Sequence, residues 1–169
     1  MMHAMKPVAM DSVATRLRYT DENCTIKGAL EIVGEKWSLL VLREAFFGIR
    51  RFDDFHRVLG CARNLLSDRL AKLVDHGVLE RVAYREPGQR TRHEYHLTEK
   101  GLDLQPALVA LMQWGDRWTA DADGPPVEIR HRGCGAKVDA VLACEEGHGA
   151  LAPRETEAVP GPGARLAAA

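Results

Sequence analysis

The stretch from Cys61 to His76 (CARNLLSDRLAKLVDH) carries polar side chains at a spacing that suits contact with nucleic acid. Leu66, Leu70 and Leu73 recur at helical spacing, which predicts a helix with one buried face. The opposite face presents polar residues from its first turns: Arg63, Asn64, Ser67, Asp68 and, beside them, Arg69. Such side chains hydrogen-bond base edges and phosphates, so we expect them to contact DNA. An ordinary solvated helix has the same pattern, and the flanking segments must decide between the two interpretations.

These flanking segments predict a helix-turn-helix with a wing. Residues 50–59 (RRFDDFHRVL) predict a shorter helix, which the turn Gly60-Cys61-Ala62 joins to the longer one. After Gly77 the sequence VLERVAY alternates as a half-buried strand, and TRHEYHLT forms a second strand beyond the turn at Pro87-Gly88. Four arginines at the start of the shorter helix and on the hairpin are expected to hold phosphates: Arg51, Arg85, Arg90 and Arg92. The alternative is that these arginines are merely solvated.

The composition is that of a soluble globular protein with a locally basic surface. Of 169 residues, 46% are hydrophobic and 28% are charged, and the net charge is -1. A DNA-binding surface must therefore be local. Between residues 63 and 92, seven basic residues (Arg63, Arg69, Lys72, Arg81, Arg85, Arg90, Arg92) stand against four acidic ones (Asp68, Asp75, Glu80, Glu86). Without an apolar run of membrane-spanning length or a signal-peptide pattern, we expect a cytoplasmic protein with no membrane partner.

Three further helices are expected to complete a fold that is mainly α with a small β-hairpin wing. Residues 37–47 (WSLLVLREAFF) are apolar around most of the circumference, which is typical of a helix at the centre of a domain. The last helix is capped by Thr98 and runs to about Ala120, with a kink or break near Gln105 because Pro106 follows. A first helix is also predicted, because Ile26, Leu30 and Val33 repeat at helical spacing before Gly34. Large apolar residues of the first and last helices are predicted to form a homodimer interface: Ile26, Leu30, Leu108, Leu111, Trp114 and Trp118.

The chain is expected to have three regions. Residues 1–23 lack sustained periodicity and are expected to form a flexible arm. Residues 24–120 are expected to hold a winged helix-turn-helix domain with its dimerisation helix. Residues 121–169 form an extension, in which residues 127–132 and 137–144 are candidates for the short strands of a hairpin. Its end, PGPGARLAAA, is too poor in core-forming residues and is expected to be disordered.

In this order the motifs resemble the HxlR-type family of winged helix-turn-helix transcriptional regulators, over roughly residues 24–118. Cys24 and four segments carry the resemblance: GEKWSLLVLREAFFG (34–48), RRFDDF (50–55), ARNLLSDRLAKLVDHGVLER (62–81) and EYHLTEKG (94–101). The resemblance implies a homodimer that binds an inverted-repeat operator in double-stranded DNA and that responds to an oxidant, an electrophile or another small molecule. One departure is Ala62, because many members place Ser at this cap of the recognition helix. The extension beyond residue 121 is a second departure from the compact members.

The four cysteines are candidates for sensing or metal chemistry. Cys24 lies near the start of the first helix, where the helix dipole favours a thiolate, and the resemblance implies a redox or electrophile sensor there. The alternative for Cys24 is a small core residue, and Cys61 is interpreted as a packing residue. Four residues of the extension have the chemistry of zinc ligands: His131, Cys134, Cys144 and His148. Because the paired C-x-x-C spacing is missing, we expect a metal-free hairpin, with neither a metal nor a cofactor.

The sequence contains no constellation that predicts catalysis, so we expect a regulator and not an enzyme. Its seven histidines are scattered, and it has neither a glycine-rich phosphate loop nor a serine in a nucleophile elbow. The alternative function is a winged-helix protein-interaction or sensor module without significant DNA affinity. Salt distinguishes the two, because a protein that holds phosphates loses affinity steeply as the salt concentration rises.

Overall fold

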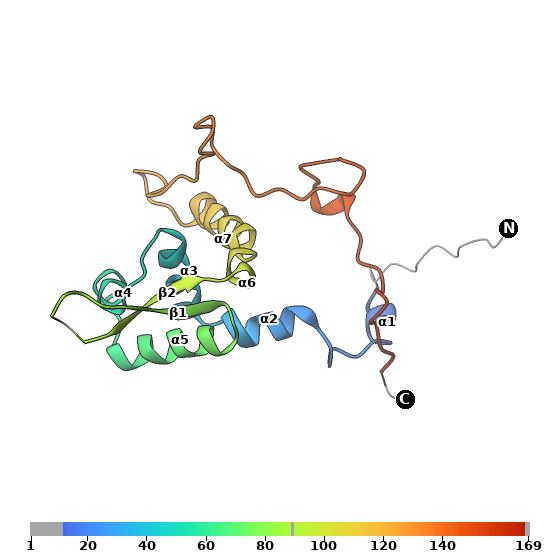
Figure 1. Cartoon of the computed structure of the whole chain (residues 1–169). Helices are drawn as coiled ribbons and strands as arrows, with labels where there is room; N and C mark the ends of the chain where they lie inside the picture. The colour runs from blue at the N-terminus through green and yellow to red at the C-terminus, as the bar shows by residue number, and fades with distance from the viewer. Residues whose placement is uncertain (1–11, 89, 168–169) are drawn as a thin grey trace. The chain divides into compact units, whose positions relative to one another are not determined.

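The computed structural model describes residues 12–88 and 90–167, which belong to two compact units. The larger unit, Leu30–Ala140, contains the end of α2 (Thr25–Val33) and most other elements, which Figure 1 labels. They are α3 (Lys36–Phe46), α4 (Phe52–Leu59), α5 (Arg63–Asp75), β1 (Leu79–Tyr84), β2 (Arg92–Leu97), α6 (Glu99–Leu102) and α7 (Gln105–Trp118). The predicted winged helix-turn-helix, mainly α with a small β-hairpin, is confirmed. Across the described residues, none of the helices has the length and apolar character needed to cross a bilayer.

The α3 helix lies at the centre of the larger unit and supplies much of its core. Val41, Leu42 and Ala45 are fully buried, as the apolar circumference of this helix predicts. They belong to one cluster with side chains of α4, α5 and the hairpin: Phe55, Leu66, Leu70, Leu73, Val78 and Leu79. Burial of each large apolar side chain stabilises the fold by about 1.5–3 kcal/mol. This shared cluster therefore holds α4 and α5 against the same central helix.

The connection between α4 and α5 is a tight turn. Gly60 ends α4 in the left-handed region with a φ of 63°, a conformation that strains most other residues. The α5 helix begins after Ala62 without a hydrogen bond from a capping side chain, as this alanine predicts. The first N–H groups of α5 are therefore left for water or for an anion.

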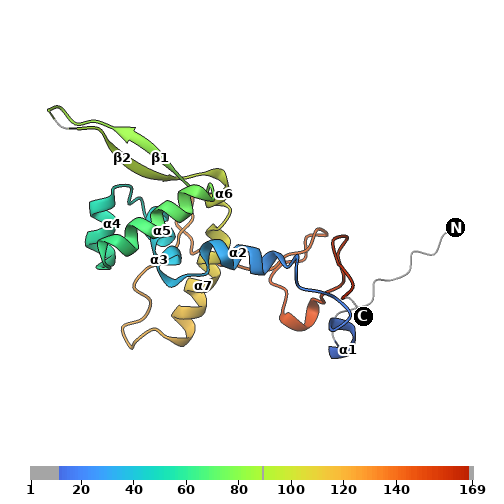
Figure 2. The same cartoon turned by 90° about the horizontal axis from the view of Figure 1, so that it is seen from below.

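The hairpin of β1 and β2 forms the predicted wing, and Figure 2 shows it extending past α4. The segment before α4 adds to its sheet. Tyr95 of β2 donates its backbone N–H to the carbonyl of Arg50 at 2.8 Å, and Arg51 forms a β-bridge with Glu94. These backbone contacts fix the base of the wing to the start of α4.

The single helix predicted after the wing is divided into α6 and α7, which confirms the predicted interruption near Gln105. Thr98 caps α6, because its Oγ1 accepts a hydrogen bond from the N–H of Gly101 at 3.1 Å. Gly101 also permits a close approach to the hairpin, since a Cβ there would lie 2.2 Å from the carbonyl oxygen of Val78. Pro106 lies in the first turn of α7, where its missing N–H costs no helical hydrogen bond.

The two strands predicted in the extension do not form, and isolated bridges replace them. One bridge, between Arg130 and Lys137, lies in the larger unit. Gln113 of α7 holds the segment that follows it: its amide donates to the carbonyl of Val138 at 2.7 Å and accepts from the N–H of Ala140 at 2.9 Å. Hydrogen bonds from a helix side chain therefore satisfy part of this backbone in place of a strand ladder.

The smaller unit is formed by the two ends of the chain, Met1–Ala29 and Val141–Ala169. It contains α1 (Val13–Arg16) and a 3-10 turn (Pro153–Glu155), neither of which the sequence predicted. The side-chain amide of Asn23 joins the two ends by donating to the carbonyl of Gly163 at 2.6 Å. Of the expected flexible arm, residues 1–11 lie outside the described residues. The three-region division, the flexibility of the arm and the disorder of the end stay predictions.

Candidate nucleic-acid interface

The start of α5 presents a polar face on the side opposite to its buried leucines. Leu66, Leu70 and Leu73 are fully buried in the core. Four of the residues predicted to contact DNA are exposed: Arg63, Asn64, Ser67 and Asp68. Because the leucines fix the rotation of the helix, these polar groups remain accessible to a ligand outside the protein. Their contact with DNA stays a prediction.

The structure does not place Arg69 with the other α5 residues that were predicted to contact DNA. Its side chain is only 19% exposed, and its Nη2 lies 3.3 Å from Oε2 of Glu35, the residue before α3. Position 69 follows Leu66 by three residues and therefore lies on the same side of the helix. Arg69 connects α5 to the start of α3 and does not belong to the exposed polar face.

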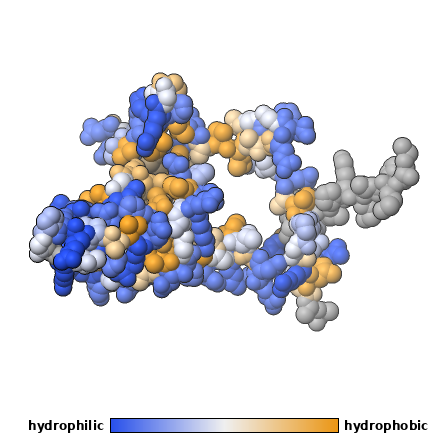
Figure 3. Space-filling view, in the orientation of Figure 1, coloured by the Kyte–Doolittle hydropathy of each residue, from blue (hydrophilic) through white to orange (hydrophobic). Residues whose placement is uncertain are grey.

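A groove of about 630 Å³ lies between the first turns of α4 and α5 and the hairpin. Arginines outnumber carboxylates along it: Arg51, Arg57, Arg63, Arg81, Arg90 and Arg92 against Asp53, Asp54 and Glu86. The fold thus brings together predicted arginines from three separate segments of the chain. Hydrophilic residues cover this end of the larger unit in Figure 3. A groove with such an excess of guanidinium groups suits a polyanion such as the DNA backbone.

Arg63 is held in this groove by two neighbours from α4. Its Nη2 donates to Oδ1 of Asp53 at 2.8 Å, and its guanidinium lies 4.8 Å from the centroid of the Phe52 ring. The hydrogen bond from Arg63 keeps the pKa of Asp53 below its ordinary value. The Arg63 side chain is still 61% exposed, so this ion pair is easily exchanged for a contact with a ligand.

Arg51 has more internal partners than its predicted role as a phosphate contact implies. Its Nε donates to Glu94 at 3.0 Å and its Nη1 to Glu86 at 2.9 Å, while its guanidinium lies 4.4 Å from the centroid of the Tyr84 ring. The hydrogen bond from Arg51, followed by that from His96, lowers the pKa of Glu94. Arg51 therefore links the start of α4 to the wing, with a side chain that is still 44% exposed.

The wing carries the remaining predicted phosphate contacts, Arg85, Arg90 and Arg92, and all three residues are exposed. Arg92 begins β2 and lies opposite Tyr84 in the hairpin register. Because the base of the wing is fixed to the start of α4, Arg90 and Arg92 line the groove from the side of the hairpin.

The lining residues that the sequence analysis did not assign to DNA contact include Arg57, Arg81, Tyr84 and His93. Arg81 faces Tyr95 across the hairpin, and its guanidinium lies 5.9 Å from the centroid of that ring. The cross-strand register was the signal that could have identified Arg81, once the hairpin turn had been placed. Arg57 pairs with Asp54 at 3.2 Å, one turn earlier in α4, a spacing that the sequence itself displays.

The cysteines have different environments. Cys24 is exposed directly before α2, and its carbonyl accepts a hydrogen bond from the N–H of Gly28 at 3.1 Å. Cys61 is buried in the core cluster, which confirms its interpretation as a packing residue. In two exposed turns a thiol lies beside an imidazole, with Sγ to Nδ1 distances of 3.2 Å for Cys134 with His131 and for Cys144 with His148. Within the described ranges, no group of three or more candidate metal ligands is assembled.

Most residues of the predicted dimer interface are large apolar side chains exposed to solvent. Ile26 and Leu30 of α2 have this character, as do three residues of α7: Leu111, Trp114 and Trp118. Leu108 differs from the other predicted interface residues, because it is half-buried and packs against the core of the larger unit. Exposed tryptophans on a regular helix favour a covering partner.

Comparison with known proteins gives matches that include the whole groove. A family model described as HxlR-like helix-turn-helix matches residues 32–123. The uncharacterized HTH-type transcriptional regulator Rv3095 of Mycobacterium tuberculosis (strain ATCC 25618 / H37Rv) is 46% identical over 147 residues, which cover 87% of this chain and 92% of that protein.

Solved structures also resemble the chain, over different shares of its length. The crystal structure of PA1607, a candidate transcription factor, is 37% identical with a TM-score of 0.69, and the match covers 80% of this chain and 93% of that one. The redox regulator HypR in its oxidized form is 26% identical with a TM-score of 0.53, and the match covers 58% of this chain and 100% of that one.

Proposed function

Because the chain belongs to the HxlR-like helix-turn-helix family of transcriptional regulators, we propose that it binds an inverted-repeat operator as a homodimer. The observation that carries this proposal is the arginine-lined groove beside the exposed start of α5. In a helix-turn-helix protein the second helix enters the major groove with its N-terminal residues toward the bases. The α5 helix has the required polar residues in its first turns.

The two parts of this surface have different chemical roles in the proposed complex. Asn64 and Ser67 are short, exposed and able both to donate and to accept, which suits contact with base edges. Arg90 and Arg92 of the wing suit phosphates, because a guanidinium forms paired hydrogen bonds with phosphate oxygens. We therefore assign sequence reading to α5 and positioning on the backbone to the wing.

The homodimer part of the proposal is supported by the apolar side chains that α2 and α7 leave exposed. Two identical subunits related by a two-fold axis read two half-sites of opposite orientation. The operator is therefore expected to be an inverted repeat with half-sites about one helical turn apart.

The regulated step is proposed to be modification of Cys24 by an oxidant or an electrophile. Its support is the exposure of this thiol at the start of α2, together with the resemblance to HypR, which is named a redox regulator. Sulfenylation, adduct formation or a bond to another thiol would each change the start of the helix that we place at the dimer interface. A change of angle between the two recognition helices would then break the contacts of one helix with its DNA half-site.

Selection of bound duplexes from a random pool, repeated with oxidant present, tests the proposal directly. We expect one inverted-repeat motif to be enriched, and its recovery to fall when oxidant is added. The affinity for the selected duplex should fall steeply with salt, with a slope of about -0.9 in log K against log salt for each phosphate contact. A pool without enrichment, together with weak and salt-insensitive binding, would instead support the alternative of a winged-helix module without DNA affinity.

A further inference from the structure

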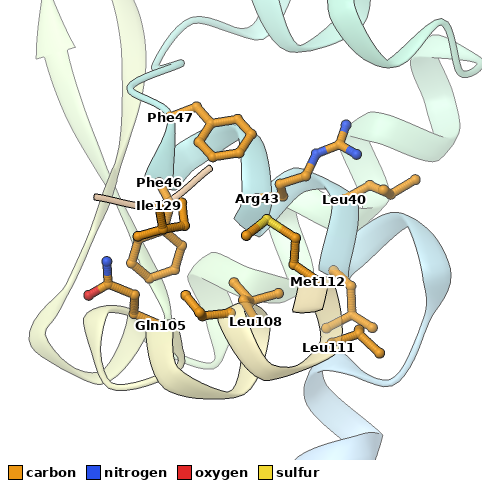
Figure 4. Close-up of a pocket in the computed structure, with 11 residues that line it drawn as sticks. Leu40, Arg43, Phe46, Phe47, Gln105, Leu108, Leu111, Met112 and Ile129 are labelled. Atoms are coloured by element: carbon orange, nitrogen blue, oxygen red, sulfur yellow. The ribbon is translucent and has the colours of Figure 1, made fainter. Parts of the chain in front are cut away.

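A cavity of about 220 Å³ lies between α3 and α7 and shares no lining residue with the basic groove. Its walls are mostly carbon, from Leu40, Phe46, Phe47, Leu108, Met112 and Ile129. Figure 4 shows the phenylalanine rings and the methionine sulfur around one space, with the polar ends of Arg43 and Gln105 at its edge. All of these residues belong to the larger unit.

The size and the lining of this cavity favour an apolar guest over water. An apolar cavity of about 150 Å³ stays dry and takes up benzene, because water there has too few hydrogen-bonding partners. The cavity between α3 and α7 is lined in the same way, but it opens to solvent beside the exposed side chains of Phe47 and Leu111. Aromatic rings and a thioether make favourable contacts with an aromatic guest in addition to simple burial.

The charges next to the cavity exclude an ionic guest. Arg43 is paired with Glu44 through its Nε at 2.7 Å and through Nη2. Glu44 is buried. Because its negative charge is paired with the positive charge of Arg43, the two residues together present no net charge to the cavity. A carboxylate entering the cavity would lose its hydration and would have to compete with buried Glu44 for Arg43, whereas an ammonium group would find no carboxylate among the described lining residues.

We propose that this cavity binds an uncharged aromatic molecule of about one substituted ring. A helix of a second subunit is the alternative occupant, but a whole helix, about 10 Å wide with its side chains, does not fit within a space of 220 Å³. The exposed indole side chains Trp114 and Trp118, which favour a protein partner, do not line the cavity, whereas Leu108 and Leu111 of the predicted dimer interface do. Binding at this site requires no DNA, but the cavity shares Leu108 and Leu111 with the interface of the proposed homodimer, so the inference rests on that dimer leaving the cavity open.

The test uses 4-fluoroacetophenone as a probe, the full chain without DNA, and ¹⁹F NMR. We expect saturable broadening and a shift of the fluorine line, and at least about tenfold weaker binding of the charged analogue 4-fluorobenzoate, which corresponds to about 1.4 kcal/mol. Met112→Trp should fill the cavity and weaken binding of the ketone by about tenfold or more. Leu102→Trp is the matched control on exposed α6 and should leave binding unchanged.

Circular dichroism is used to check that both variants are folded. If Met112→Trp does not fold, Ile129→Trp replaces it, because Ile129 lies after α7 and outside the core cluster. The proposal is overturned by a probe that does not saturate, by equal binding of ketone and carboxylate, or by a filled variant that binds like the control. Loss of binding on dimerisation would assign the cavity to a second subunit and would also overturn it.

Discussion

Asn64 and Arg63 are neighbours at the start of α5, but their surroundings differ. Asn64 is exposed, whereas Arg63 already donates to Asp53 at 2.8 Å. We therefore expect Asn64→Ala to remove a base contact without disturbing the fold. On the selected duplex the loss should be about 1–3 kcal/mol, and on a random duplex it should be smaller. Fluorescence anisotropy with both duplexes measures the difference, and equal losses on the two would refute a role in base reading.

Arg90 of the wing is expected to show the opposite behaviour. Arg90→Ala should weaken binding to selected and random duplexes alike, because a phosphate contact is independent of sequence. It should also reduce the slope of log K against log salt by about one unit. Arg117→Ala, which removes the same charge from the last turn of α7, is the matched control. A salt slope that Arg90→Ala leaves unchanged would place this arginine outside the interface.

Asp53 sets how readily Arg63 is released to a ligand. The carboxylate holds Arg63 in the free protein, and it also brings a negative charge into the groove that we propose binds phosphates. Asp53→Asn should therefore bind DNA several-fold more tightly, with most of the gain on random duplexes. The comparison requires anisotropy at two salt concentrations, since the gain should shrink as salt screens the groove. Weaker binding by this variant would mean that Asp53 positions Arg63 productively for the complex.

Helical periodicity predicted which residues of α5 are exposed. It did not predict which acidic residues form ion pairs with the arginines of this helix. The face of Asn64 and Ser67 follows from the spacing of buried leucines on the same helix. The pairing of Arg63 with Asp53 joins two helices across a turn, and that of Arg69 with Glu35 joins positions far apart in the sequence. Such pairs depend on how helices pack, which the spacing within one helix does not contain.

At the scale of the elements, the clamp formed by Arg51 and Glu94 connects α4 to the wing. The folded state lowers the pKa of Glu94 from its ordinary value of 4.5, chiefly through the hydrogen bond from Arg51. The stabilisation is therefore present above pH 4.5 and is lost as the pH falls through the lowered pKa. Glu94→Gln should lower the melting temperature at neutral pH, and the difference from the natural chain should vanish in acid.

Thermal unfolding followed by circular dichroism at a series of pH values measures this difference. Glu80→Gln, an exposed change on the neighbouring strand β1, is the matched control and should show no such pH dependence. A difference for Glu94→Gln that stays constant from neutral pH to acid would show that the clamp does not stabilise the fold.

The helices and the wing could be predicted because their signals are local. The apolar circumference of α3, the cap at Thr98 and the interruption at Pro106 each lie within a few residues of the feature they produce. The extension could not be predicted in the same way. Its backbone near Val138 is held by Gln113 of α7, a contact across 25 positions that no periodicity reports.

At the scale of the whole molecule, the proposed modification of Cys24 would make the protein a switch. We expect Cys24→Ser to bind the selected duplex normally and to stay bound when oxidant is added. The natural chain should be released, because modification at the start of α2 alters the arrangement of the two subunits. Alkylation followed by mass spectrometry of each cysteine peptide should find Cys24 modified fastest and the buried Cys61 slowest. Release of Cys24→Ser by oxidant would move the sensor to Cys134 or Cys144.

The proposed dimer requires that a second subunit cover the exposed apolar residues of α7. Trp114 is 59% exposed. A charged side chain at such a position is tolerated in a monomer but is unfavourable in an apolar interface. Trp114→Glu should therefore raise the dimer dissociation constant by about thirtyfold or more, as expected for a central residue that contributes about 2 kcal/mol. Sedimentation velocity over a range of concentrations measures this constant. Leu102→Glu, on the similarly exposed Leu102 of α6, is the control and should remain dimeric.

A dimer of fixed geometry constrains the operator as well as the protein. Its two α5 helices can enter the major groove on one face of the DNA only if the half-sites are one helical turn apart or a whole number of turns apart. Inserting about five base pairs between the half-sites turns one of them to the opposite face, so the second subunit loses its contacts. Affinity should then fall to that of a single half-site, and Trp114→Glu should bind the original and the lengthened operators equally. A natural chain that binds both operators with the same affinity would show that its two subunits do not read DNA together.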